Sequence, residues 1–425
     1  MHSNSRRSAL PALAFFAAFF AGLLSGACSD PRAAESASLR EDPAEVAPLA
    51  DTRSRLLDLA FEAASAMPLV PHVKNRSRAQ DEIVAASLEL DQPERASRYA
   101  AGIENWRRGA GYADVAFHYA QADAVAEAER CLELARQVAE SHEIESGDEE
   151  SSQAWRRDRV RAKIARTYVW LGRAEEAARF AEGLEDSEIG AVEVVQAMRT
   201  EAGAFDERLE ALDAVVATGG FERVRAALAA YTQLIGRSYA DEAQRAQIEE
   251  RIRGATKKVP ATVQIEVWEE LAEVALARGD KPKTLAVLAE ARSILEASRW
   301  NSTSHIPLAA GLGALRFRAG EEREGRGEVD AVRARYARER ETIVDIYRAG
   351  VLRPLAEAYL TMSDVPTARE LYAQAVEAGV ANPNSRPRAE DLCATCCSMA
   401  VHGFEPDAAL WARLAEVRAG LCEPW

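Results

Sequence analysis

One short pattern recurs along most of the chain and restricts its fold more than any other feature. An apolar helical segment ends in a turn that contains Gly or Asp, and a small residue then opens a second helix with apolar residues four and seven places further on. The clearest copies are Leu171–Ala177, Gly279–Thr284 and Ser363–Ala368. This spacing gives each helix one apolar stripe, which a single helix pair cannot cover by itself. We therefore expect neighbouring pairs to stack into a solenoid.

Weaker copies of the pattern fill much of the remaining sequence. The small residues that open the second helices are Ala96, Ala128, Ala177, Val224, Thr284, Gly325, Ala368 and Ala408. Successive members of this set are 32 to 60 residues apart, which is irregular but fits a unit of two helices. The alternative to a solenoid is a generic all-helical bundle of the same composition.

The composition favours helices throughout. Alanine makes up about a fifth of the 425 residues, 48% are hydrophobic and only 7% are aromatic. Ala, Leu, Glu and Arg are strong helix formers, so the composition predicts an all-α protein. The net charge of −15 disfavours a nucleic-acid binder, because such proteins present a basic surface.

The repeated unit resembles the tetratricopeptide repeat, a helix-turn-helix of about 34 residues with small residues where its helices touch. The resemblance extends over most of residues 80–425, although no copy has the family's full set of Trp, Leu-Gly, Tyr, Ala, Phe and Pro positions. It implies a right-handed α-solenoid of tetratricopeptide-like repeats. Proteins of this kind bind extended peptides or partner proteins along a concave groove.

The first 27 residues have the pattern of a secretory signal peptide. Arg6 and Arg7 precede the apolar stretch Ala9–Leu24, and Gly26-Ala27-Cys28 follows. The ending resembles the lipobox of bacterial lipoproteins, which implies lipid attachment at Cys28. Ser25 departs from the aliphatic residue that the lipobox prefers, and ordinary cleavage with secretion is the alternative. Either way we expect an exported protein of the bacterial cell envelope, in the periplasm or on the outer membrane if it is lipid-anchored.

The sequence predicts three regions: the signal peptide 1–27, a flexible tether 28–50 and a helical repeat domain 51–425 with sub-blocks 51–237 and 261–425. Removal of the signal peptide, which has two Arg and no acidic residue, takes the net charge to −17. Anionic lipid repels such a surface, so we expect membrane contact through acyl chains alone. Two segments interrupt the repeats: an acidic loop at 142–153, and a spacer at 240–260 that contains a helix from Asp241 to Gly254.

A basic helical segment follows the acidic loop. Arg156, Arg159 and Lys163 fall on one helix face, where they could bind an anion or an acidic peptide in the groove. A solvated face balanced by the neighbouring acidic loop is the simpler interpretation.

The cysteines give a second set of candidates. Apart from Cys28 and Cys131, they are Cys393, Cys396, Cys397 and Cys422. In an exported protein some of these four could form a disulfide. Zinc binding would need His402 as a fourth ligand, but one continuous helix cannot direct all these side chains to one ion. We expect buried packing or a structural disulfide, and no metal or cofactor.

Enzyme signatures are lacking: the sequence has no Gly-x-Ser-x-Gly, no phosphate-binding loop and no His-Glu-x-x-His. We therefore expect no catalytic residues. The predicted function is a non-enzymatic scaffold for protein–protein interactions in the envelope, with an unidentified protein or peptide partner. The alternative is a helical toroid enzyme that acts on glycans or another small substrate. An open superhelix would favour the scaffold, and paired carboxylates around one central cavity would favour the toroid enzyme.

The proposed lipid anchor leads to a first prediction. Cys28→Ala removes the thiol that would be acylated, so the protein should move from the membrane fraction to the soluble fraction. Immunoblotting of fractionated cells measures this, with Cys422→Ala as the matched control. Unchanged membrane partitioning of Cys28→Ala would contradict lipid attachment at this residue.

Overall fold

The computed structural model describes residues 51–141, 150–199 and 205–425. These residues form nineteen α-helices and no β-strand, which confirms the all-α prediction. The helices are α1 Asp51–Ala66, α2 Leu69–Glu89, α3 Pro93–Ala101, α4 Arg107–Gln121, α5 Val125–Glu140, α6 Glu150–Trp170, α7 Ala174–Ala181, α8 Asp186–Arg199, α9 Phe205–Thr218, α10 Phe221–Arg237, α11 Glu242–Thr256, α12 Ala261–Ala277, α13 Lys281–Ala297, α14 Ser302–Arg318, α15 Glu322–Glu339, α16 Asp345–Thr361, α17 Val365–Val380, α18 Ser385–Val401 and α19 Ala408–Ala419.

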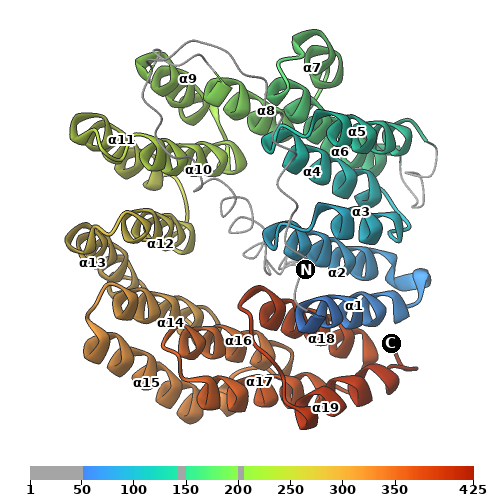
Figure 1. The fold of residues 1–425 in the computed structure, drawn as a ribbon, viewed down its shortest axis with the longest axis vertical. Coiled ribbons are helices and arrows are strands. Elements are labelled where there is room, and N and C mark those ends of the chain that lie inside the picture. Colours follow the sequence, from blue (N-terminus) through green and yellow to red (C-terminus); the bar gives the residue numbers. More distant parts are fainter. Residues whose placement is uncertain (1–50, 142–149, 200–204) are drawn as a thin grey trace, which may run out of the picture.

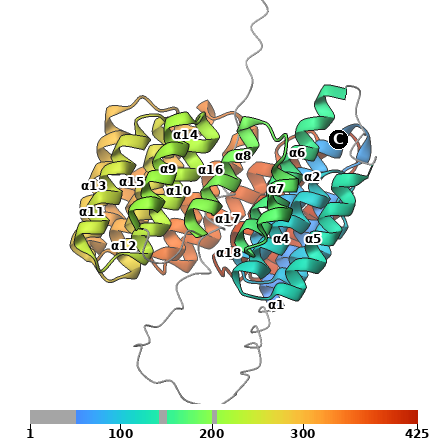
Figure 2. The ribbon, with the colours of Figure 1, turned by 90° about the horizontal axis from the view of Figure 1, so that it is seen from above.

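Consecutive helices pack as pairs, as the recurring pattern predicts. From α2/α3 to α16/α17, each even-numbered helix packs against the odd-numbered helix that follows it. The even-numbered helices also pack against one another from pair to pair and form an inner layer, while the odd-numbered helices form an outer layer (Figure 1). Seen from the edge, the pairs lie side by side as a single band (Figure 2). The structure is therefore a solenoid of helix pairs.

The solenoid closes into a ring, the arrangement that the sequence left as the alternative to an open superhelix. Helix α18 packs against both α2 and α1, so the two ends of the repeat array meet (Figure 1). The contact between α1 and α18 is as extensive as the contact within a sequential pair. Helix α1 thus completes a pair with α18, and α19 packs outside them. The structure is therefore not the open superhelix that would favour the scaffold.

The turns within the pairs use left-handed backbone conformations. Gly172 has a φ of 76°, Gly279 a φ of 72° and Ser363 a φ of 59°. Asp91, Asp123, Gly320 and Gly403 also have positive φ at the turns of the weaker copies. Gly, Asp and Asn adopt this region most readily and end a helix there. The predicted turn residues therefore reverse the chain between the two helices of a pair.

The small residues lie mostly where helices touch. Of the eight, all except Ala408 are buried, and Ala408 is exposed at the start of α19. Gly325 gives the clearest reason for a small side chain, because a Cβ there would come within 2.5 Å of the backbone nitrogen of Phe317. Any side chain at Gly325 would push α15 away from α14.

Ion pairs connect successive inner helices around most of the ring. They are Arg353–Asp391 (3.2 Å, α16 to α18), Arg78–Glu390 (3.0 Å, α18 to α2), Arg107–Asp81 (2.7 Å, α2 to α4), Arg166–Asp114 (3.1 Å, α4 to α6), Arg159–Glu188 (3.2 Å, α6 to α8), Arg223–Glu193 (3.6 Å, α8 to α10) and Arg318–Glu273 (α12 to α14). Outer helices are linked in the same way, for example by Arg251–Asp213 between α11 and α9. The ion pairs thus run between repeats as well as within them.

The hydrophobic core divides into two clusters. One joins α1–α8 to α14–α19 across the ring closure, and the other extends from Val194 to Leu315. These boundaries differ from the expected sub-blocks 51–237 and 261–425. Within the expected spacer, α11 nearly matches the predicted helix and packs against α10 as an ordinary repeat pair.

Several sequence predictions fall on residues that the structure does not describe. The signal peptide, Cys28 and the tether 28–50 precede the described residues. Of the predicted acidic loop, 142–149 is not described, whereas residues 150–153 belong to α6. Among the described helices, none is long and apolar enough to cross a bilayer.

The ring closure leads to a second prediction. Removing residues 1–66 deletes α1, whose Leu56, Leu57 and Ala60 are completely buried. The melting temperature should fall by roughly 5 °C or more, because α18 loses its apolar partner. The buried thiols of Cys393 and Cys396 should also begin to react with Ellman's reagent.

A chain that lacks residues 1–50 but keeps α1 is the matched control. It should match the full mature protein in melting temperature and in thiol reactivity. Equal behaviour of the two truncated chains would show that α1 does not hold the ring closed.

Candidate functional site

Helix α12 carries a row of carboxylates on the inner face of the ring. Its buried face, which includes Trp268 and Leu271, packs against α13, while α10 and α14 lie on its two flanks. The row consists of Glu266, Glu269, Glu270 and Glu273. Spacings of three and four residues place these four side chains on one face of the helix. This face lies opposite the outer helix α13 and therefore points toward the centre of the ring. We call it the α12 carboxylate row.

Three of these carboxyl groups have raised pKa values. Burial raises the pKa of Glu266 and of Glu270 to about 7, although Arg225 of α10 lowers both values. Burial also raises the pKa of Glu269 to about 8, and Glu266, Glu270 and Glu273 raise it further. Glu273 forms an ion pair with Arg318 of α14. The row therefore holds more carboxylates than its neighbouring cations neutralise.

Of the four glutamates in the row, Glu269 has the surroundings that least favour its ionised form. Its Oε1 atom is buried and has no hydrogen-bond partner. This oxygen lies against α14 at Gly311, where a Cβ would come within 2.8 Å of it. A buried carboxylate without a partner is costly, and protonation lowers that cost. This arrangement explains why the pKa of Glu269 is raised.

A second acidic region lies on α2, on the opposite side of the ring from α12 (Figure 1). Burial raises the pKa of Glu82 to about 7, while Arg78 and Arg353 lower it. Burial also raises the pKa of Glu89, which His402 lowers and Glu357 raises. Both sides of the inner layer thus contain carboxyl groups that are partly protonated near neutral pH.

Hydrogen bonds and ion pairs also connect α2 and α16 to α18, where the ring closes. Glu390 of α18 accepts hydrogen bonds from Asn75 at 2.6 Å and from Arg78 at 3.0 Å. On the same side, the Ser398 hydroxyl donates to Glu357 at 2.6 Å, and His402 lies 3.7 Å from that carboxylate. These contacts fix α2, α16 and α18 relative to one another.

The predicted groove residues already have partners within the protein. Arg159 forms an ion pair with Glu188 of α8 at 3.2 Å, and Lys163 pairs with Asp114 of α4. Arg156 is buried and lies over the ring of Trp155. These three side chains connect α6 to its surroundings rather than forming one open basic surface. The partners of Arg159 and Lys163 belong to α8 and α4, not to the acidic loop of the simpler interpretation.

The structure contains the four candidate cysteines as free thiols, so it does not form the disulfide that the sequence left open. The thiol of Cys393 donates to the carbonyl oxygen of Ala60 in α1 at 3.1 Å. Cys396 is also buried, Cys397 is half-buried and Cys422 is exposed. Burial raises the pKa of Cys393, Cys396 and Cys397 well above that of a free thiol. Packing in the ring closure is thus the role that their positions support.

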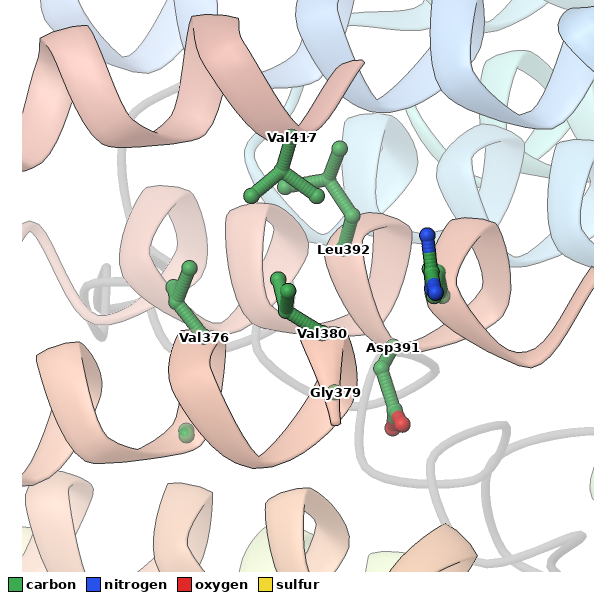
Figure 3. Close-up of a pocket in the computed structure, with 8 residues that line it drawn as sticks. Val376, Gly379, Val380, Asp391, Leu392 and Val417 are labelled. Atoms are coloured by element: carbon green, nitrogen blue, oxygen red, sulfur yellow. The ribbon is translucent and has the colours of Figure 1, made fainter. Parts of the chain in front are cut away.

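No group of three or more His, Cys, Asp or Glu side chains in the described ranges could hold a metal ion. A small cavity between α17, α18 and α19 is lined by Val376, Leu392 and Val417, with Asp391 beside it (Figure 3). Its volume of about 10 Å³ could hold at most about one water molecule.

Comparisons with protein-family models, with curated proteins and with solved structures gave no match to this chain. The candidate site therefore depends on the geometry of the chain's own residues.

The sequence pattern alone did not distinguish the α12 carboxylate row from other acidic helix faces. The spacing of its four glutamates was a usable signal, because it places them on one helix face. Any acidic helical protein has many such spacings on its surface, so spacing alone could not select this one. The row became distinct only when α13 covered the opposite face of α12 and α10 and α14 packed on its two flanks.

The raised pKa values lead to a third prediction. In the folded protein Glu269 keeps its proton up to a pH of about 8, whereas the unfolded chain loses it near pH 4.5. The free energy of unfolding should therefore fall as the pH rises from about 5 to about 8. Glu269→Gln removes this ionisation and should stabilise the protein at pH 8 by on the order of 1 kcal/mol, with little effect at pH 5.

Urea unfolding at the two pH values measures this difference. Glu290→Gln, at an exposed position on α13, is the matched control and should leave the pH dependence unchanged. If Glu269→Gln destabilises the protein equally at both pH values, the side chain is ionised and paired, contrary to this prediction.

Proposed function

We propose that this chain is a non-enzymatic, lipid-anchored ring scaffold of the bacterial cell envelope, whose inner face binds a basic segment of a partner protein. The α12 carboxylate row is the observation that carries the proposal. Its carboxyl groups are poorly neutralised by the protein itself, and Glu269 has an oxygen without a partner. Lys or Arg side chains of a partner would supply the missing positive charge.

The energetics of such binding follow from the raised pKa values. A cation close to Glu266 or Glu270 favours the ionised carboxylate and lowers its pKa. Binding would therefore release protons near pH 7 and would strengthen as the pH rises from 6 to 8. Screening by salt would weaken it, because these charges lie on a face open to the interior of the ring.

Export and lipid attachment rest on the N-terminal sequence. Cys28 would be the first residue of the mature chain, and 22 residues separate it from the start of α1. A tether of this length, with its Ala, Pro and Glu residues, would hold the ring away from the bilayer. The negative net charge agrees with attachment by acyl chains rather than by a basic surface.

A helical toroid enzyme is the second candidate, and the closed ring is the observation that favours it. Glu82, with a pKa of about 7, would be the residue suited to donate a proton. Helices α2 and α12, which carry these carboxyl groups, lie however on opposite sides of the ring (Figure 1). Loss of glycan hydrolysis in Glu82→Gln, with the ring still folded, would move this candidate ahead of the scaffold.

The scaffold proposal gives a fourth prediction. The mature protein should bind a ten-residue peptide of alternating Lys and Ala in calorimetry at low salt. The measured enthalpy should vary with the ionisation enthalpy of the buffer, which reports the release of protons. Glu266→Gln combined with Glu270→Gln should weaken binding about tenfold or more, because two carboxylates of the row are lost. The control pair, Glu290→Gln with Glu296→Gln, makes the same charge change at exposed positions on α13.

Equal weakening in the two double variants would show that only net charge attracts the peptide, and would overturn the specific role of α12. Crosslinking in the native envelope, read by mass spectrometry, then identifies the partner. A reproducible protein whose crosslinks map to α10, α12 or α14 would support the scaffold. Enrichment of glycans without any protein would support the toroid enzyme.

A further inference from the structure

A pocket of about 490 Å³, widely open to solvent, lies between α5, α6 and α7, on a different part of the ring from α12 (Figure 1). We call it the arginine-lined cavity. Its lining consists of Ala139, Glu140, Arg157, Arg161, Arg179 and Phe180. Cavities of roughly 300–1,000 Å³ are typical of sites for small organic ligands. Three of these six lining residues are arginines, so the cavity is locally basic in a chain whose net charge is −15.

The three arginines differ in whether their charge is paired within the protein. Arg161 forms an ion pair with Asp158 at 3.2 Å and donates to the carbonyl oxygen of Glu182 at 2.6 Å, so its guanidinium is held in place. Arg157 and Arg179 are exposed, and neither forms an ion pair with another residue in the described part of the chain. Two guanidinium groups therefore remain free to bind an anion beside a third that is fixed.

The cavity also has an apolar wall. Phe180 and Ala139 are buried in the packing of α7 and α5, and the ring of Phe180 packs against Tyr168 with centroids 5.8 Å apart. The guanidinium of Arg179 lies 5.4 Å from the centre of the Phe180 ring. An aromatic or aliphatic group could pack against this wall while its charged group meets the arginines.

We propose that this cavity binds a small organic anion in which a phosphate or carboxylate group is joined to a compact apolar body. Arginine is suited to both anions, because its planar guanidinium donates paired hydrogen bonds to two oxygens. Arg157 and Arg179 supply the positive charge, and Phe180 and Ala139 receive the apolar body. The carboxylate of Glu140, which shares the lining, repels an anion, but the three arginines outnumber it.

The sequence did not predict this cavity, although it did predict a basic face on α6, the helix that contributes two of the lining arginines. The predicted basic face, Arg156, Arg159 and Lys163, is the side of α6 that pairs with neighbouring helices. Arg157 and Arg161 lie four residues apart on another side of the same helix, and Arg179 reaches them only because α7 folds back along α6. The proposal does not depend on the scaffold function, since none of these residues belongs to the inner carboxylates.

Calorimetric titration of the mature protein with phenyl phosphate, benzoate and inorganic phosphate at 150 mM salt tests the proposal. We expect phenyl phosphate or benzoate to bind at least tenfold more tightly than inorganic phosphate, and the tighter of the two identifies the charged group. Arg157→Gln combined with Arg179→Gln should weaken binding tenfold or more. Circular dichroism confirms that the variant is folded.

Arg98→Gln combined with Arg130→Gln is the matched control, with the same charge change at exposed positions on α3 and α5. It should bind as the unaltered chain does. Equal losses in both double variants, or no binding of any probe below 10 mM, would overturn the site. If binding appears only after Glu143, Glu145, Asp148 and Glu149 are changed to Gln, the cavity serves the chain's own acidic segment, and the proposal of an external ligand is overturned.

Discussion

The packing of α1 against α18 determines the shape of the whole molecule. Each inner helix already has neighbours from the adjacent pairs, but the two ends of a repeat array ordinarily remain exposed and need capping. Here the first described helix covers the apolar face of α18, with Leu56, Leu57 and Ala60 completely buried. The two ends cap each other, and the array becomes a ring whose inner layer surrounds one central region.

In the closed ring, ion pairs of the same kind connect most neighbouring inner helices. Arginine outnumbers lysine by 47 to 6, and its forked guanidinium forms many of the ion pairs between repeats. A single exposed pair contributes only about 0–1 kcal/mol. Because such pairs occur between most neighbouring inner helices, together they favour a single alignment of each repeat against its neighbour. The α12 carboxylate row stands out because its acidic groups exceed the nearby cations, which is a property suited to binding rather than to packing.

The sequence predicted the local structure well, for identifiable reasons. Turn residues such as Gly279 and Ser363 adopt the left-handed backbone that the pattern required, and Ala96 and Ala368 are buried where helices touch. The candidate sites were predicted less well. Arg159 and Lys163 were recognised as a basic helix face, but their partners, Glu188 and Asp114, belong to other repeats. Spacing along one helix contains no information about residues 29 or 49 positions away.

Helix positions, turns and the pairing of helices are determined by the sequence itself, because each depends on residues close together in the chain. Ring closure, the carboxylate row with raised pKa values and the arginine-lined cavity were decided by the tertiary structure. The closure joins helices more than 300 residues apart, as in the hydrogen bond from Cys393 to Ala60. Burial and neighbouring charges, which set a carboxyl pKa, also come from such distant contacts. The local sequence pattern therefore determines the helix pair that repeats, whereas packing between distant residues determines the ring and the sites that form on it.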